Sequence, residues 1–160
     1  MNKPRLATKD DMARVLELIT ELAIYEKEPD AVSITLEQLI SDGFGEQPKF
    51  VCFVIDYENK VEGMALIYQR YSTWKGEVVH LEDLIVSQKL RGKGLGTLLL
   101  DEVVKYGKAK GVKRISWDVL DWNEPAIKFY KQKGANVMTD WDIVQMDENA
   151  IDNYVRNINS

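Results

Sequence analysis

A glycine-rich stretch, Arg91-Gly-Lys-Gly-Leu-Gly-Thr97, constrains this chain more than any other feature. It follows an apolar run that ends in Leu84, Ile85 and Val86, and it precedes a segment with apolar residues at helical spacing. Glycines let the backbone turn tightly and approach a ligand, and the unpaired N–H groups at a helix start favour an anion. The stretch predicts a strand-to-helix turn that binds phosphate, although a turn without a ligand has the same composition.

The spacing of the glycines excludes two common nucleotide motifs. A P-loop carries a lysine directly after its last glycine, whereas Thr97 follows Gly96 in this chain. The dinucleotide pattern G-x-G-x-x-G also fails, because the glycines stand at 92, 94 and 96. The pattern that remains, Arg-x-x-Gly-x-Gly from Arg91 to Gly96, resembles the acetyl-coenzyme A pyrophosphate loop of the GNAT acetyltransferases.

Length and charge narrow the functions further. A chain of 160 residues fits one domain, 1–160, whose core needs neither metal nor disulfide. The net charge of −5 argues against a nucleic-acid binder and suits a cationic substrate better. We expect no membrane association, because no apolar run is long enough to span a bilayer and no apolar signal stretch stands at the start. The single cysteine favours a cytoplasmic location.

Hydrophobic periodicity predicts a mixed α/β sheet flanked by helices, not an even alternation of strands and helices. Helices are expected over residues 8–29, 35–42, 95–111 and 123–134. Strands are expected over 50–57, 61–71, 78–87 and 112–120, around 137 and over 143–146, before a polar tail. The first two strands should form a hairpin, since a short polar turn separates them.

Two adjacent carboxylates, Glu82 and Asp83, interrupt the apolar strand that leads into the glycine-rich stretch. Charges within such a strand are costly to bury without a reason. In a regular strand they face opposite sides, so either one points to solvent or a β-bulge re-aims both. Acetyl transfer to an amine needs a base, because a free lysine-like amine titrates at about 10.4. Solvated carboxylates at a sheet edge are the alternative.

Tyr130 and Asn123 share the last expected helix. The Tyr130 phenol could protonate a departing coenzyme A thiolate, although its spacing also fits a core tyrosine. Asn123 is an N-cap or a cofactor contact. His80 shares a strand face with Glu82 and could relay a proton, but it stays outside the catalytic set. Alternation buries Cys52, which raises a thiol pKa, so we expect direct attack by the amine.

The chain resembles one branch of the GNAT superfamily, the spermidine/spermine and thialysine acetyltransferases. The matching segments are 21–23 with 25–26, 42–46, 71–76, 81–83, 91–96, 120–125 and 129–131. Residues 72–76 and 119–123 look closer to the thialysine enzymes, whereas 123–125 and 129–131 look closer to the polyamine enzymes. The stretch after Gly134 is shorter than in either, which leaves the role of Asp140 open.

The resemblance implies a GNAT acyltransferase fold, with a mixed, mostly antiparallel sheet whose central strands splay to admit pantetheine. It implies an acetyl-coenzyme A dependent N-acetyltransferase without a metal, which acts on a polyamine or diamine, or on lysine and its thialysine analogue. Glu82 would be the base, acting through water, and Tyr130 the general acid. Family members are homodimers, so a homodimer is also implied.

The resemblance further assigns the binding residues. The donor would be held by Leu84, Ile85, Val86, Arg91, Gly92, Lys93, Gly94, Leu95, Gly96, Thr97, Asn123, Glu124, Pro125 and Ala126. The amine would be held by Tyr25, Glu26, Glu82 and Asp83. Two other functions stay open: a module that senses acyl-coenzyme A without turnover, and acetylation of protein lysines or N-termini.

Overall fold

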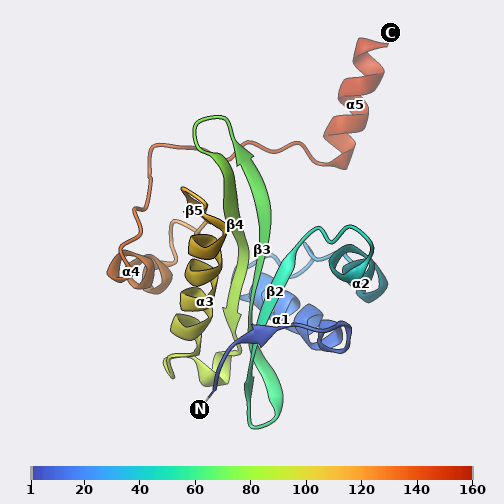
Figure 1. Cartoon of the computed structure of the whole chain (residues 1–160). Coiled ribbons are helices and arrows are strands. Elements are labelled where there is room, and N and C mark those ends of the chain that lie inside the picture. The colour runs from blue at the N-terminus through green and yellow to red at the C-terminus, as the bar shows by residue number, and fades with distance from the viewer. Residues whose placement is uncertain (1, 160) are drawn as a thin grey trace. The chain divides into compact units, whose positions relative to one another are not determined.

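The computed structural model describes residues 2–159, and the chain divides into two compact units, one up to Leu120 and one from Asp121. In the first unit, five strands form one sheet in the order β1-β2-β3-β4-β5 (Figure 1). The strands are β1 (Arg5–Leu6), β2 (Val51–Tyr57), β3 (Lys60–Ser72), β4 (Gly76–Val86) and β5 (Ile115–Ser116). The helices are α1 (Met12–Tyr25), α2 (Leu36–Phe44) and α3 (Leu95–Lys110), with the 3₁₀ turns η1 (Lys9–Asp11) and η2 (Gln88–Leu90). The predicted mixed α/β class is confirmed.

Among the described strands, three neighbouring pairs are antiparallel and the pair β4–β5 is parallel. The predicted hairpin joins β2 to β3 through Glu58 and Asn59, whose positive φ values of 49° and 63° suit a two-residue turn. The parallel pairing matches Val79 with Ile115 and His80 with Ser116. Beyond His80, β4 has a strand neighbour only in β3 within the described chain, as the expected splay of the central strands requires.

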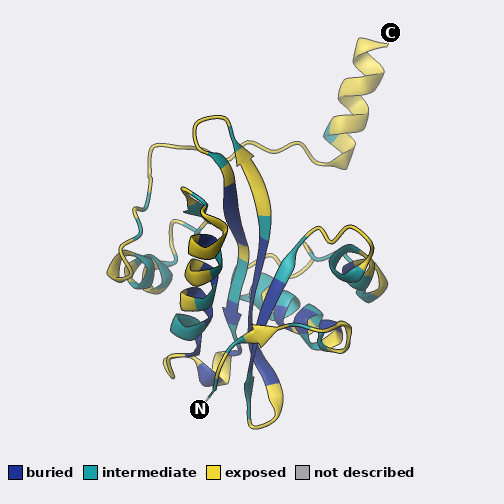
Figure 2. Cartoon of the chain, viewed as in Figure 1, coloured by how far each residue is buried: buried dark blue, intermediate teal, exposed yellow. Residues whose placement is uncertain are grey.

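The core of the first unit lies on both faces of the sheet, because side chains alternate along the strands. Cys52 and Val54 of β2 belong to a cluster with Met12, Val15 and Leu18 of α1. The next residue, Phe53, points to the other face and packs edge-on against Tyr106 of α3, with 5.9 Å between the ring centroids. Figure 2 shows the buried residues along the central strands and on the inner sides of α1 and α3.

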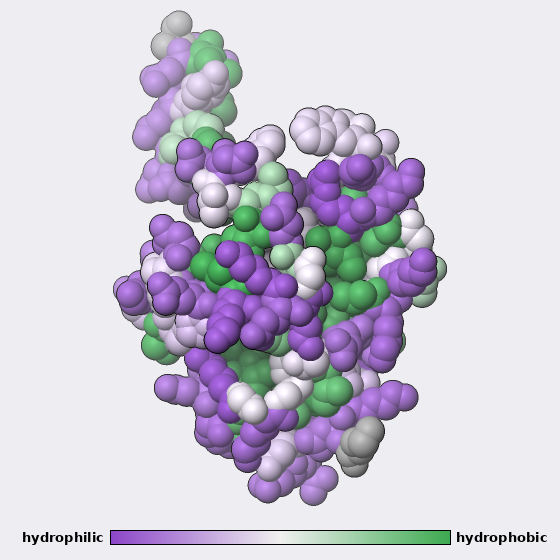
Figure 3. All heavy atoms as spheres, turned by 90° about the vertical axis from the view of Figure 1, so that its left-hand side faces the viewer, coloured by the Kyte–Doolittle hydropathy of each residue, from purple (hydrophilic) through white to green (hydrophobic). Residues whose placement is uncertain are grey.

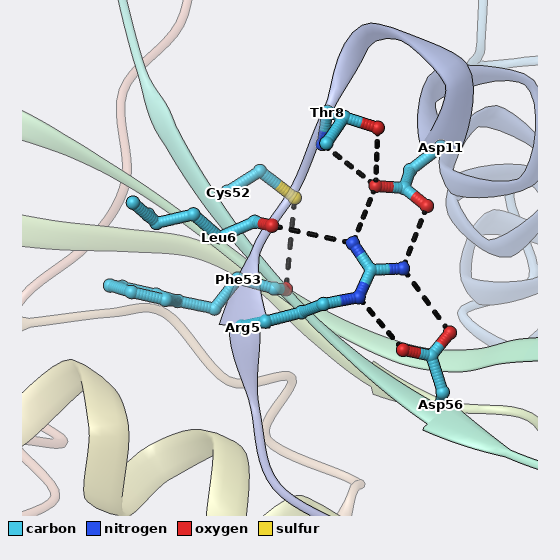
Figure 4. Close-up of polar contacts among 7 residues, drawn as sticks. All are labelled: Arg5, Leu6, Thr8, Asp11, Cys52, Phe53 and Asp56. Atoms are coloured by element: carbon cyan, nitrogen blue, oxygen red, sulfur yellow. Dashed lines mark hydrogen bonds and ion pairs between the residues drawn. The ribbon is translucent and has the colours of Figure 1, made fainter.

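Charged side chains fix the start of the chain (Figure 4). Arg5 donates from Nη1 to Asp11 Oδ2 and from Nε to Asp56 Oδ2, each at 2.8 Å. The Thr8 N–H donates to the same Asp11 carboxylate at 2.7 Å. The hydrogen bond from Arg5 is the main reason why the pKa of Asp11 falls to about 2. One guanidinium thus ties β1 to the turn before α1 and to β2.

The second unit contains α4 (Glu124–Gln132) and α5 (Glu148–Ile158). The expected strands around 137 and over 143–146 are wrong, because the described residues there form no strand. Alternating apolar residues satisfy the period of a strand, but a strand forms only where a neighbour supplies backbone hydrogen bonds. The expected polar tail is α5, which begins where the Asp147 side chain accepts a hydrogen bond from Ala150 N–H at 2.8 Å.

Boundaries in the first unit also differ from expectation. The strand expected over 112–120 is only Ile115–Ser116. The helix expected to reach Pro29 ends at Tyr25, because Lys27 takes a positive φ of 65°. No helix within residues 2–159 has both the length and the apolar composition needed to cross a membrane.

Candidate active site

The glycine-rich turn joins η2 to the start of α3. Gly92 and Gly94 have φ values of 80° and 82°, which explains why glycine stands at both positions. A Cβ on either glycine would meet no atom within 4 Å, so the backbone there faces open space. Among the described residues, the N–H groups of Gly92 and of residues 94–97 donate no backbone hydrogen bond. The turn therefore offers several adjacent donors.

These donors suit the two phosphates of coenzyme A. The first N–H groups of α3, a 16-residue helix, carry the partial positive charge of its dipole. Two cations flank them: the Arg91 guanidinium lies 4.3 Å from the centre of the Tyr25 ring, and Lys93 Nζ lies 3.2 Å from Tyr57 Oη. The geometry of the turn fits the expectation that residues 91–97 bind pyrophosphate.

The strand that leads to the turn carries a β-bulge at Glu82. Leu66 of β3 lies opposite Asp83, whereas Ile67 lies opposite Leu81, so Glu82 is the extra residue. The Glu82 side chain is 53% exposed, and Asp83 is half-buried. Both outcomes left open by the sequence therefore occur: the strand is bulged, and one carboxylate faces solvent.

Glu26, Glu82 and Asp83 form an acidic group between the end of α1 and the middle of β4. Burial is the main reason why the pKa of Asp83 rises to about 6, and the charges of Glu82 and Glu26 raise it further. Burial also raises the pKa of Glu26. Carboxylates that repel one another and lose water gain most from a cation placed between them. The acidic group contains three of the four residues expected to hold the amine.

His80 is buried beside this acidic group. Its Nε2 lies 3.6 Å from Glu82 Oε2, and its Nδ1 lies 3.1 Å from Ser116 Oγ of β5. The ring also packs on Tyr68, with 5.2 Å between the centroids. These contacts anchor the bulged strand to both of its neighbours.

The environment of Cys52 does not suit a catalytic nucleophile. Cys52 is 5% exposed, and burial is the main reason why its pKa rises to about 12, as its position in an apolar strand predicts. A thiol that resists ionisation is a poor nucleophile. Within residues 2–159, no group of three or more His, Cys, Asp or Glu residues is placed to hold a metal ion.

A groove that the sequence does not predict runs along α1. Its volume is about 530 Å³, and it is lined by Glu17, Thr20, Glu21, Ile24, Tyr25, Gln88 and Arg91. Glu21 Oε1 accepts a hydrogen bond from the Gln88 N–H at 2.7 Å. Tyr25, expected to hold the amine, thus lies next to Arg91, expected to hold the donor. The sequence carries no direct signal for the contact between Tyr25 and Arg91. The spacing of four between Glu21 and Tyr25 indicates only that these two residues lie on one face of a helix.

The second unit holds the remaining expected residues. Asn123 is the N-cap of α4, and its side chain accepts a hydrogen bond from Ala126 N–H at 3.4 Å, so the expected cap is confirmed. Glu124 and Pro125 form the first turn. Tyr130 lies in the same helix, with its ring 5.4 Å from that of Phe129. The catalytic role expected for Tyr130 stays a prediction.

A glycine-rich turn with open N–H donors, placed between a central strand of a mixed sheet and a helix, is the arrangement expected of coenzyme A dependent acyltransferases. The chain belongs to the acetyltransferase (GNAT) family, whose sequence profile matches residues 12–135, and it is therefore an acetyltransferase. The fold agrees. An integron cassette protein from the mobile metagenome of V. cholerae superimposes with a TM-score of 0.79 over 97% of this chain and 98% of its own, at 21% identity.

Two relatives indicate which branch of the family the chain resembles. The thialysine N-epsilon-acetyltransferase of Bos taurus is 40% identical over 144 residues, which cover 85% of each chain. A spermidine/spermine N(1)-acetyltransferase-like protein of Homo sapiens is 32% identical over 82% of this chain and 20% of its own length. The resemblance to both enzyme groups is confirmed.

Proposed function

We propose that this protein transfers the acetyl group of acetyl-coenzyme A to the primary amine of a small molecule. The observation that carries the proposal is that β4 bears Glu82 and Asp83 of the acidic group at its bulge and then leads into the open donors of residues 91–97. In this proposal the carboxylates of β4 attract the positively charged amine, and the turn that follows β4 binds the negatively charged donor. Acetyl-coenzyme A supplies the acetyl group as a thioester, and the high pKa of Cys52 supports direct attack by the amine.

In this proposal each expected residue has a separate task. The backbone of Leu84, Ile85 and Val86 bonds pantetheine, because β4 lacks a second strand neighbour there among the described residues. Glu82, exposed at the bulge, takes the amine proton through water. Asp83 and Glu26 hold the ammonium. In the second unit, residues 123–126 line the coenzyme and Tyr130 protonates the thiolate.

The amine is proposed to be thialysine or lysine, or a polyamine. The name of the bovine relative supports the first pair, and that of the human relative supports the second. An acidic group of three carboxylates suits any acceptor that brings a positive charge.

A panel of acceptors tests the proposal. Thialysine, lysine, spermidine, putrescine and a lysine-containing peptide are each offered with acetyl-coenzyme A, and thiol release and acetylated product are measured. We expect at least one free amine to raise thiol release about 100-fold or more above hydrolysis. Binding of acetyl-coenzyme A without turnover on any acceptor would instead identify an acyl-coenzyme A sensor, and activity on the peptide alone would identify a protein acetyltransferase.

We also propose a homodimer in the cytoplasm. The single cysteine supports the location. The support for assembly is α5, on which Ile151, Tyr154, Val155 and Ile158 are 46–66% exposed at the spacing of one helix face. Figure 3 shows apolar side chains open to solvent on this helix. Sedimentation equilibrium checks the assembly: a monomer at micromolar concentration would refute it.

A further inference from the structure

A buried carboxylate contacts the segment that leads into the glycine-rich turn. Glu62, in β3, is 2% exposed, although a glutamate inside an apolar sheet is costly to bury. It has two cationic partners: Arg14 Nη2 at 2.9 Å and Lys89 Nζ at 2.7 Å. Burial opposes its ionisation, but the hydrogen bonds, led by that from Lys89, outweigh burial and lower its pKa to about 2. Glu62 is therefore a carboxylate throughout the neutral range.

Both the main chain and the side chain of Glu62 are bonded to the segment that enters the turn. Its carbonyl oxygen accepts from the Ser87 N–H at 2.8 Å, and its carboxylate pairs with Lys89 two residues later. Between these two residues, the Gln88 N–H donates to Glu21 of α1. Leu90, the residue before Arg91, is 5% exposed. Every residue from 87 to 90 is thus anchored, whereas Gly92 and Gly94, which follow, face open space.

The burial of Lys89 differs from that of its partner. Its side chain is 67% exposed, so the ammonium reaches inward from a solvated turn to a carboxylate that is 3% exposed. Arg14 is shared between partners: it pairs with Glu62 through Nη2 and with Glu17 through Nη1 at 2.7 Å, and it donates from Nε to the Val61 carbonyl at 3.0 Å. Lys89 therefore completes the charge balance of Glu62, and, because Lys89 belongs to η2, the same ion pair holds η2 against β3.

We propose that Glu62 and Lys89 are positioning residues that hold the turn in its donor-binding conformation before acetyl-coenzyme A arrives. The inference rests on the proposed function, because it takes residues 91–97 as the pyrophosphate site. A turn that is already ordered loses less conformational entropy when its ligand binds. Loss of the ion pair between Glu62 and Lys89 should then weaken the binding of acetyl-coenzyme A, while the acidic group and the reacting atoms stay in place.

Lys89→Met tests the inference with little risk to folding, because the Lys89 side chain is largely exposed and Glu62 keeps its ion pair with Arg14. We expect the Kd and KM for acetyl-coenzyme A to rise about fivefold or more, the loss that one charge-assisted bond implies, with kcat and the KM for the amine within twofold. Lys89→Arg should restore most of the binding. Lys105→Met is the matched control: Lys105 is 72% exposed and pairs with Glu102 on α3.

Two further measurements separate the inference from its alternatives. In the double variant Glu62→Gln with Lys89→Met, the Kd for acetyl-coenzyme A should equal that of whichever single variant binds more weakly. Both changes remove the same interaction, the ion pair between Glu62 and Lys89, so their effects should not add. Additive losses would mean that Lys89 contacts the donor itself, and they would overturn the inference. Amide hydrogen exchange of residues 87–97 without ligand should quicken in Lys89→Met, and unchanged exchange would overturn it as well. If the unmodified protein binds no acetyl-coenzyme A, the proposed function fails, whatever the exchange shows.

Discussion

At the scale of single residues, Asp83 carries the clearest electrostatic signal. An unfolded aspartate titrates at about 3.9, whereas burial, Glu82 and Glu26 raise the folded pKa of Asp83 to about 6. The folded state therefore binds this proton more tightly than the unfolded state. The contribution is favourable below about pH 4 and is lost as the pH rises through 6. At neutral pH the carboxylate weakens the fold, which is expected of a group kept for ligand binding.

Asp83→Asn should therefore raise the free energy of unfolding at pH 8 by about 2 kcal/mol, after allowance for partial exposure, and change it little at pH 4. The same variant should raise the KM for the amine, because one of three attracting charges is lost. Urea denaturation at the two pH values checks the first claim, and steady-state kinetics checks the second. An equal stability change at both pH values would show that the Asp83 charge is not the cause.

At the scale of elements, α3 offers an internal comparison for the turn. A left-handed glycine stands at each of its ends, Gly94 with φ of 82° and Gly111 with φ of 70°. Alanine at either position costs about 1 kcal/mol of stability, because a Cβ disfavours positive φ. Only Gly94 belongs to the proposed phosphate site.

Gly94→Ala should weaken acetyl-coenzyme A binding tenfold or more, roughly the loss of one or two backbone contacts to phosphate. Gly111→Ala should leave the Kd for acetyl-coenzyme A within twofold of that of the unmodified protein. It should lower the melting temperature about as much as Gly94→Ala does. Calorimetric titration and thermal melts of both variants check this pair. Equal Kd values in the two variants would mean that the turn has no special part in donor binding.

The same elements show what sequence can predict. α3, the Asn123 cap and the turn at Glu58 and Asn59 were predictable, because their signals are local: glycine at left-handed positions, an amide before a helix, a polar pair between apolar runs. β5 and residues 137–146 were not, since pairing depends on a partner strand that the local pattern does not specify. The bulge at Glu82 appeared only as one of two options, because its cause is the register against β3.

Some residues of the candidate site could likewise be predicted from the sequence, and others could not. The glycine-rich turn and the pair Glu82–Asp83 could be found from sequence, because glycines and charges stand out in an apolar strand. Glu62 could not, since its partners Arg14 and Lys89 lie 48 and 27 positions away in the sequence and meet it only in the folded sheet. The contact between Tyr25 and Arg91 is likewise tertiary.

At the scale of the whole molecule, low pH should undo the ion pairs that join distant elements. Asp11 and Glu62 both have a pKa of about 2 in the folded state, below the values near 4 of unfolded carboxyls. Their stabilising effect is complete above about pH 5 and is lost as the pH falls through 2. Arg5→Lys should lower the free energy of unfolding by about 1 kcal/mol at pH 7, because lysine cannot bridge Asp11 and Asp56 as a fork.

The difference between Arg5→Lys and the unmodified protein should shrink towards zero near pH 2, where Asp11 takes up its proton. Urea denaturation between pH 2 and pH 7 measures it. A difference that stays constant over this range would place the role of Arg5 in packing, not in charge.

Titration of acetyl-coenzyme A into ¹⁵N-labelled protein, followed by amide NMR, shows whether the backbone of residues 91–97 binds the donor. We expect saturable shifts that are largest for Gly92, Gly94, Gly96 and Thr97, whose open amides lie in the turn and in the first residues of α3. Absence of saturable shifts at millimolar acetyl-coenzyme A, or shifts confined to residues outside 91–97, would contradict it.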